Sequence, residues 1–268
     1  MNKSKIEWCD YTWNPVTGCL HGCEYCYARR QVNRFKGELY PNKVYATEHC
    51  DLKLYKSTGY GFYENHSIVK PVKNKEGRII PYPFGFKPTF HRYRLDEPQK
   101  LKKPSKIFVV SMGDLFGEWV PNDWIEEVFR ACEDAPQHKY IFLTKNPQKL
   151  QYPFYCYFNA NQNWWVGTSI TNQIDVERAN IMLDKTSMRT HCFLSIEPLL
   201  GEVKNLPLNS GGIQWVIIGQ QTGPGAKPPK YEWVQSIIDQ CKTARVPVFV
   251  KPPLYEKFPI QQWPEGLE

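Results

Sequence analysis

The sequence predicts an α/β fold built around a parallel β-sheet. Short apolar runs recur through the second half of the chain and alternate with amphipathic, helix-like segments. Near-continuous apolar runs are typical of parallel strands that are buried on both faces. The chain has 268 residues, of which 41% are hydrophobic, and this is enough for one large domain with a substantial core.

The predicted elements follow in a regular order. A first strand is expected at residues 11–16 (YTWNPV). Six later strands are expected at 106–111 (KIFVVS), 140–144 (YIFLT), 164–170 (WWVGTSI), 191–196 (HCFLSI), 214–219 (QWVIIG) and 246–250 (VPVFV). Helices are expected at 121–132, 175–183 and 231–241. The first of these begins with Pro and Asn/Asp capping signals and carries one apolar stripe. Repeated strand–helix–strand units imply a parallel sheet, either open or closed into a barrel.

Residues 37–104 interrupt this order and are predicted to be an insertion in a single domain that spans residues 1–268. They contain seven prolines, and one strand is expected within residues 86–95 (FKPTFHRYRL). Residues 70–106 carry eleven Lys/Arg against three Asp/Glu, whereas the whole chain has a net charge of +7. The basic character therefore belongs to this segment.

Composition also bears on the cellular compartment. No apolar run approaches the ~20 residues of a membrane span, and the N-terminus shows no apolar core of a signal peptide. An odd count of nine cysteines argues against a disulfide framework. We therefore expect a cytoplasmic protein without a membrane segment.

Three cysteines lie close together in the stretch TGCLHGCEYCYARR. Cys19, Cys23 and Cys26 have the spacing C-x-x-x-C-x-x-C, between a predicted strand and a predicted helix. One interpretation is a structural zinc site, with His21, His49 or Cys50 as the fourth ligand. The other is a four-iron cluster held by three thiolates instead of the usual four, which leaves one iron open to another ligand.

The spacing resembles the signature of the radical S-adenosylmethionine (radical SAM) superfamily, which usually has an aromatic residue just before the third cysteine, here Tyr25. Further segments resemble the phage- and prokaryote-associated family of three-cysteine, radical-SAM-like proteins. Those segments include FVVSMGDLFGEWVP, FLTKNPQKL, WVGTSITNQ, FLSIEPLLGEV and VPVFVKP. The resemblance implies a partial (β/α)6 TIM-like barrel of radical SAM type. It also implies a [4Fe–4S] cluster on the three cysteines, SAM as second cofactor, and an electron donor such as flavodoxin or ferredoxin.

The chain departs from the family pattern at three places, one of which is position 9, where Cys9 replaces the usual hydroxyl residue. Gly219-Gln220-Gln221-Thr222 stands where family members often carry Gly-Gly-Glu-Ser, and Lys251-Pro252-Pro253 stands where a Lys-Gln-Trp-like motif is common. The missing carboxylate puts an acid/base role at the sixth strand in doubt. We assign no catalytic side chain.

Polar residues follow successive predicted strands, and in parallel barrels the active site lies at these carboxyl ends. By analogy with the superfamily, Ser111 and Asp114 approach the SAM amino group, and Ser169 approaches the ribose. Arg178 is expected either to pair with the SAM carboxylate or to be a solvated helix residue. Glu197 is expected to bind ribose hydroxyls or substrate, or to form a structural ion pair with Lys145. The full expected cofactor-binding set is Tyr25, Ser111, Asp114, Thr144, Lys145, Ser169, Arg178 and Glu197.

The basic segment interleaves rings with cations. Tyr82, Phe84, Phe86, Phe90 and Tyr93 alternate with Lys87, Arg92, Arg94, Lys100, Lys102 and Lys103. Cations for phosphate and rings for base stacking are typical of nucleic-acid binding, although a solvated loop fits the same pattern.

The sequence favours an enzyme that cleaves SAM reductively and abstracts hydrogen from a nucleic-acid base or nucleoside, in repair or modification. A peptide or small-metabolite substrate and a partner protein stay open. The alternative is a non-catalytic nucleic-acid-binding protein with a structural zinc or iron–sulfur knot.

Overall fold

The computed structural model describes residues 1–35, 50–56, 62–74, 76–151 and 153–268. The chain divides into two compact units, Met1–His138 and Lys139–Glu268. The sequence-based expectation of one domain over residues 1–268 stays a prediction. None of the helices in the described ranges is both long and apolar enough to cross a bilayer.

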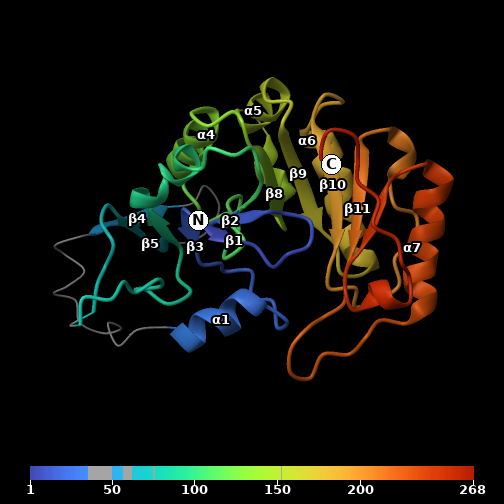
Figure 1. The fold of residues 1–268 in the computed structure, drawn as a ribbon, viewed down its shortest axis with the longest axis horizontal. Helices are drawn as coiled ribbons and strands as arrows, with labels where there is room; N and C mark the ends of the chain where they lie inside the picture. Colours follow the sequence, from blue (N-terminus) through green and yellow to red (C-terminus); the bar gives the residue numbers. More distant parts are fainter. Residues whose placement is uncertain (36–49, 57–61, 75, 152) are drawn as a thin grey trace. The chain divides into compact units, whose positions relative to one another are not determined.

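The first unit contains the paired strands β1, β2 and β7, a four-stranded sheet, and helices (Figure 1). Its elements are β1 (Asn2–Lys3), β2 (Tyr11–Trp13), β3 (Val16–Thr17), α1 (Tyr27–Phe35), β4 (Cys50–Lys56), β5 (Phe62–Ile68), β6 (Thr89–His91), α3 (Glu97–Lys100), β7 (Lys106–Val109) and α4 (Asn122–Glu133). Strand β2 pairs antiparallel with β1 and parallel with β7. The second sheet has the order β3-β6-β5-β4.

The predicted first strand is divided in two by Asn14 and Pro15. The part before them, β2, joins the parallel pair with β7, and the part after them, β3, pairs with β6 of the insertion. This division turns the chain from one sheet to the other just before the three cysteines. The one strand expected within residues 86–95 is β6, and a short 3-10 turn, Arg92–Arg94, follows it.

The second unit is a regular parallel α/β array (Figure 1). Its elements are β8 (Lys139–Thr144), α5 (Phe154–Ala160), β9 (Trp164–Ser169), α6 (Glu177–Lys185), β10 (His191–Ile196), β11 (Ile213–Ile218), α7 (Tyr231–Ala244) and β12 (Val248–Val250). The strands pair in chain order, all parallel. The predicted parallel sheet is confirmed. No pairing between β8 and β12 closes it among the described residues, so the partial barrel stays a prediction.

Apolar burial explains why these segments form strands and helices. Every residue of β9 is buried, including Trp164 and Trp165, as expected for a strand covered on both faces. In α4 the predicted stripe of Trp124, Ile125 and Val128 is buried, together with Phe129 and Cys132. The carboxyl ends of β8 to β12 meet at one edge, which places the polar residues that follow them at that edge.

Candidate active site

The three cysteines lie on a short loop, Gly18–Cys26, between β3 and α1. All three thiols are free and half-buried. Gly18 has φ +89°, and a Cβ there would lie 2.3 Å from the backbone oxygen of Lys87. Gly22 also has a positive φ, +74°, but a Cβ there would meet nothing within 4 Å. Only glycine fits position 18, where the loop passes closest to neighbouring backbone.

Backbone hydrogen bonds fix the start of this loop. The Gly18 N–H donates to the Met112 carbonyl at 2.9 Å, and the Cys19 N–H donates to the Phe86 carbonyl at 3.3 Å. Gly18 also forms a parallel bridge with Gly113. The turn after β7 and the insertion therefore both hold the loop that carries Cys19.

The pKa of the Cys19 thiol is raised to about 12, mainly by burial; a hydrogen bond from the His21 backbone opposes this shift, and the nearby Asp114, Cys26 and Cys23 add to it by charge repulsion. Without a bound cation this thiol is protonated at neutral pH. A cationic metal centre reverses that preference, because it binds and stabilises thiolates. The three thiols are therefore suited to a cationic metal centre that takes thiolate ligands.

The structure surrounds the loop with polar groups from the turn after β7. The buried carboxylate of Asp114 accepts a hydrogen bond from His21 Nε2 at 2.7 Å and one from the Phe116 N–H at 3.0 Å. His21 also lies edge-on to Trp119, with ring centroids 4.8 Å apart. Sequence reasoning considered His21 only as a zinc ligand; here its ring connects the loop to Asp114. Among the described residues, no three His, Cys, Asp or Glu side chains gather around one metal-ion position.

Ser111 and Tyr25 also lie near this loop. Ser111 Oγ donates to Asn14 Oδ1 at 3.2 Å, and its carbonyl accepts from the Tyr27 hydroxyl at 2.6 Å. Tyr25 is half-buried on the loop itself. The first unit thus brings together Tyr25, Ser111 and Asp114 with the three cysteines. Asn14 was not predicted, because nothing in the sequence distinguishes it from an ordinary strand-end amide.

In the second unit, Thr144 and Ser169 end adjacent strands. Thr144 Oγ1 accepts the Asn146 N–H at 2.8 Å, which caps the turn after β8, and its carbonyl accepts from Thr168 Oγ1 at 3.0 Å. Lys145 follows and is half-buried. Ser169 is buried, and its carbonyl accepts a hydrogen bond from Arg178.

Arg178 is partly exposed and is bound to protein groups. Its Nη1 lies 3.1 Å from the Ser169 carbonyl and 2.9 Å from Asp175 Oδ1. The other oxygen of Asp175 accepts from the Thr171 N–H and hydroxyl, at 2.9 and 2.6 Å. Asp175 therefore orients Arg178 at the end of β9. Arg178 is thus a paired, partly exposed helix residue, and its role toward SAM stays a prediction. Asp175 was missed, although its i,i+3 spacing from Arg178 within the predicted helix was visible in the sequence.

Glu197 forms an ion pair with Lys251, whereas the sequence offered Lys145 as the partner. Lys251 Nζ lies 2.6 Å from Glu197 Oε1. A Cβ at Gly219 would lie 2.8 Å from Glu197 Cδ, so the glycine makes room for this carboxylate. Glu197 follows β10, Gly219 follows β11 and Lys251 follows β12, so three neighbouring strand ends meet here.

The basic segment is less available for base stacking than its sequence indicates. Phe90 is 0% exposed and packs on Trp124, so the expectation that it stacks on a base is wrong. Phe84 stacks on His66, with ring centroids 3.8 Å apart, and Phe86 packs against the core of α1. Among the cations, Arg92 Nη1 donates to both carboxylate oxygens of Glu127, each at 2.6 Å. Lys102 and Lys103 are exposed, as expected.

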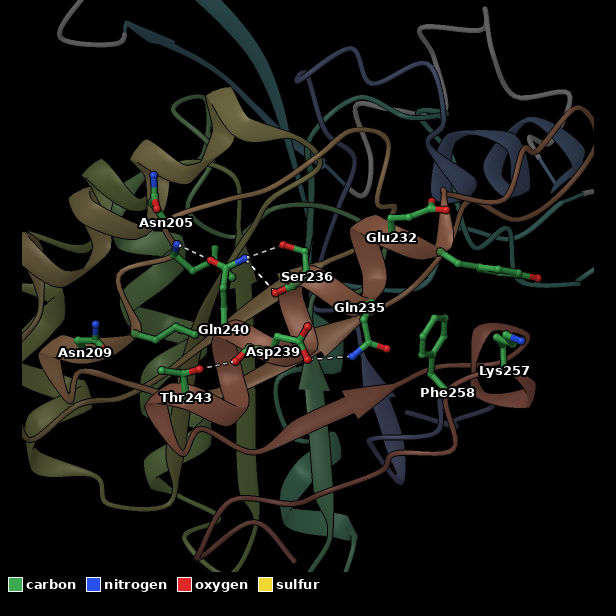
Figure 2. Close-up of a pocket in the computed structure, with 13 residues that line it drawn as sticks. Asn205, Asn209, Glu232, Gln235, Ser236, Asp239, Gln240, Thr243, Lys257 and Phe258 are labelled. Atoms are coloured by element: carbon green, nitrogen blue, oxygen red, sulfur yellow. Dashed lines mark hydrogen bonds between the residues drawn. The ribbon is translucent and has the colours of Figure 1, made fainter.

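A hollow of about 850 Å³ lies along α7 in the second unit (Figure 2). Its polar groups are largely bonded to one another: Gln235 donates to Asp239 at 2.9 Å, and Gln240 accepts from the Leu206 N–H at 3.0 Å. None of the predicted site residues lines it.

Solved structures show the same type of fold. A mutant of spore photoproduct lyase with dinucleoside spore photoproduct has a TM-score of 0.50 and 10% identity, over 93% of this chain and 79% of that chain. Spore photoproduct lyase complexed with the same dinucleoside has a TM-score of 0.48 at 10% identity, with coverages of 93% and 79%. Streptococcus suis SuiB bound to precursor peptide SuiA has a TM-score of 0.41 at 9% identity, over 57% of this chain and 40% of that chain.

At these identities the likeness concerns the fold, a mixed α/β architecture with a parallel sheet. No curated protein matches the sequence. Residues 3–253, which include the three-cysteine loop and all the strand ends described above, match the family DUF5131, described as a protein of unknown function. The chain therefore belongs to the DUF5131 family.

Proposed function

We propose that this protein is a radical SAM enzyme. The observation that carries the proposal is the three-cysteine loop: three thiols with C-x-x-x-C-x-x-C spacing, on a loop that begins at an obligatory glycine and leads from a strand into a helix. The fold likeness to spore photoproduct lyase, a member of the radical SAM superfamily, supports the proposal.

Cys19, Cys23 and Cys26 would hold a [4Fe–4S] cluster, one thiolate to each of three irons. The fourth iron then lacks a protein ligand and is available to SAM. When bound, this cluster supplies the electron that splits SAM into methionine and a 5′-deoxyadenosyl radical, which takes a hydrogen atom from the substrate. Ferredoxin or flavodoxin is the proposed class of electron donor.

The protein's own residues would orient SAM and the loop. In the first unit, Tyr25 is proposed to lie against the adenine, and Ser111 and Asp114 to approach the amino group. The bond from His21 to Asp114 keeps that carboxylate beside the loop. In the second unit, the proposed cofactor-binding residues are Thr144, Lys145, Ser169, Arg178 and Glu197. Asp175 and Lys251 would act as positioning residues for Arg178 and Glu197.

The proposed substrate is a nucleic-acid base or nucleoside. Support comes from the excess positive charge of residues 70–106 and from the exposed Lys102 and Lys103. The same observation would suit a non-catalytic nucleic-acid-binding protein with a metal knot, so the test must separate an enzyme from a binding protein.

Reductive cleavage of SAM separates the two functions. Anaerobically reconstituted and reduced protein should form 5′-deoxyadenosine and methionine, even slowly and without substrate. Cys19→Ala, Cys23→Ala and Cys26→Ala should each abolish the product and the bound iron. Cys156→Ala is the matched control, because Cys156 is an exposed thiol on α5. A colourless protein with one zinc ion per chain and no 5′-deoxyadenosine would favour the binding protein.

A further inference from the structure

A second cavity lies within the first unit, next to the three-cysteine loop. Its volume is about 520 Å³, and its wall comes from the N-terminal segment, β2, α1, the insertion and the turn after β7. Tyr27, directly after Cys26, lines it, and so does Met112, whose carbonyl holds Gly18. A ligand in this cavity would therefore lie beside the loop that carries the proposed cluster.

Arg94 supplies a cation to this cavity. Its Nη1 donates to the Asn14 carbonyl at 3.0 Å, and its guanidinium lies 5.4 Å from the centroid of the Tyr93 ring. Within the described part of the chain, no carboxylate lies within 4.0 Å of this half-buried guanidinium. The charge is thus held in place by a carbonyl and a ring, and its other N–H donors are available to an anion.

Aromatic rings surround the same space. The Tyr27 ring is 48% exposed, and its hydroxyl bond to the Ser111 carbonyl at 2.6 Å fixes the ring. Tyr82 and Tyr93 also line the cavity. Burial raises the pKa of the Tyr82 hydroxyl, and the nearby Arg94 opposes that shift, which shows that the hydroxyl and the guanidinium are close. Rings held in this way are suited to stacking on a nucleobase.

Asn14 adds a directed donor. Its Oδ1 accepts from the Met112 N–H at 2.8 Å and from Ser111 Oγ at 3.2 Å, so its Nδ2 is the free end. That Nδ2 has no hydrogen-bond partner among the residues the structure describes, although the side chain is only 9% exposed. An unpaired amide donor in a cavity wall is suited to a carbonyl or ring nitrogen of a base.

We propose that this cavity binds one nucleotide unit of the substrate, with its phosphate at Arg94 and its base among the tyrosine rings. The inference rests on the proposed function, because it names the substrate class of that enzyme.

The lining cations Lys3, Lys5 and Arg94 outnumber the one acid in the lining, Glu97, whose carboxylate pairs with the Met1 ammonium group. SAM carries no phosphate, so a phosphate requirement distinguishes this site from a SAM site.

Calorimetric titration of the reconstituted full-length protein tests the proposal. The probes are thymidine 5′-monophosphate, thymidine, inorganic phosphate and the 5′-phosphorylated thymidine dinucleotide; a pyrimidine is chosen because adenosine is part of SAM. The monophosphate should bind at least about tenfold more tightly than thymidine, because charge-assisted bonds are strong. Tighter binding of the dinucleotide would identify a nucleic-acid strand as the source; equal binding would identify a free nucleotide.

Arg94→Gln should reduce the monophosphate affinity to that of thymidine. Arg78→Gln is the matched control, because this arginine lies in the same segment with an 83% exposed side chain and is absent from the cavity wall. The ratio of the two affinities is measured within each variant, so a general loss of stability does not imitate the effect. If Arg94→Gln fails to fold, salt should weaken wild-type binding of the monophosphate and not of thymidine.

Three results would overturn the proposal: equal or undetectable binding of monophosphate and thymidine by wild type, an unchanged preference in Arg94→Gln, or displacement of the monophosphate by saturating SAM. Formation of 5′-deoxyadenosine is measured on the same preparation. Its presence without nucleotide binding refutes this inference alone, whereas nucleotide binding without it refutes the proposed enzyme and leaves the nucleotide site.

Discussion

The cysteine loop needs glycine at position 18, because any other residue would carry a Cβ where Gly18 has only a hydrogen atom. Gly18 combines a positive φ with backbone contact, whereas Gly22, four residues later, has a positive φ and open space around it. The spacing of the cysteines was visible in the sequence, but the different roles of the two glycines were not. They depend on where the Lys87 carbonyl lies, and Lys87 belongs to a segment far along the chain.

Alanine substitution at the two glycines should separate these effects. Gly22→Ala should lower the free energy of unfolding by about 1 kcal/mol, the cost of a left-handed backbone with a Cβ. Gly18→Ala should add a further penalty of roughly 1–3 kcal/mol, because the added carbon overpacks against the Lys87 backbone. Urea denaturation measures both values. Equal losses for the two variants would contradict the close approach at Gly18.

His91 gives the protein a predicted pH dependence. Burial lowers its pKa well below 6.5, and the positive charge of Arg94 lowers it further. The folded protein therefore holds this ring neutral, while the unfolded chain takes up a proton below about pH 6.5. Above pH 6.5 this histidine should therefore not change the free energy of unfolding. Below pH 6.5 it should make the free energy of unfolding fall as the pH decreases.

When the pH is lowered from 6.5 to 5.5, protonation of His91 in the unfolded chain should lower the free energy of unfolding by about 1 kcal/mol. Denaturation of protein without added iron, at several pH values, measures the slope. His91→Gln should show a smaller slope over the same range. The same slope in both proteins would show that other groups cause the acid sensitivity.

At the scale of elements, strand ends of the second unit meet through an ion pair. The sequence placed Glu197 after β10 and offered an ion pair with Lys145 as one alternative, whereas the structure pairs it with Lys251. The partner depends on how β10, β11 and β12 align in the sheet, and on the space that Gly219 leaves between them. Apolar runs predict strands well, but they do not fix which polar groups that follow different strands will touch.

A double-mutant cycle with Glu197→Gln and Lys251→Met tests this pair. Both side chains are partly exposed, so the coupling should be modest, about 1 kcal/mol in the free energy of unfolding. The cycle Glu197→Gln with Lys145→Met serves as the control, with a smaller expected coupling. A larger coupling to Lys145 would restore the sequence-based pairing and contradict the structure.

For the molecule as a whole, the rhythm of apolar runs predicted the parallel sheet because buried strands need continuous apolar sequence. It did not extend to the insertion, where the strand expected within residues 86–95 is β6 but β4 and β5 were not predicted. The basic segment was harder to interpret, because aromatic residues serve both as core and as stacking surface. Phe90 belongs to the core, whereas Tyr27, outside the predicted segment, has an exposed ring. The uneven charge of the chain, however, is a property of composition and was predictable.

That charge should be measurable as salt-dependent binding of nucleic acid. Lys102→Glu with Lys103→Glu should weaken binding of a labelled single strand and reduce the slope of log affinity against log salt by about 1–2. Lys242→Glu, an exposed lysine on α7, is the control and should have a smaller effect. Indifference of binding to the paired reversal would mean that the segment does not contact nucleic acid.

The proposed function depends on three thiolates that hold a four-iron cluster and leave one iron open for SAM. Electron paramagnetic resonance of the reduced, reconstituted protein, recorded with and without SAM, measures this arrangement. A [4Fe–4S] signal that changes when SAM is added is expected in wild type and in Cys156→Ala, and no such signal is expected in Cys19→Ala. A cluster signal that SAM leaves unchanged, or one that survives the loss of Cys19, would rule this arrangement out.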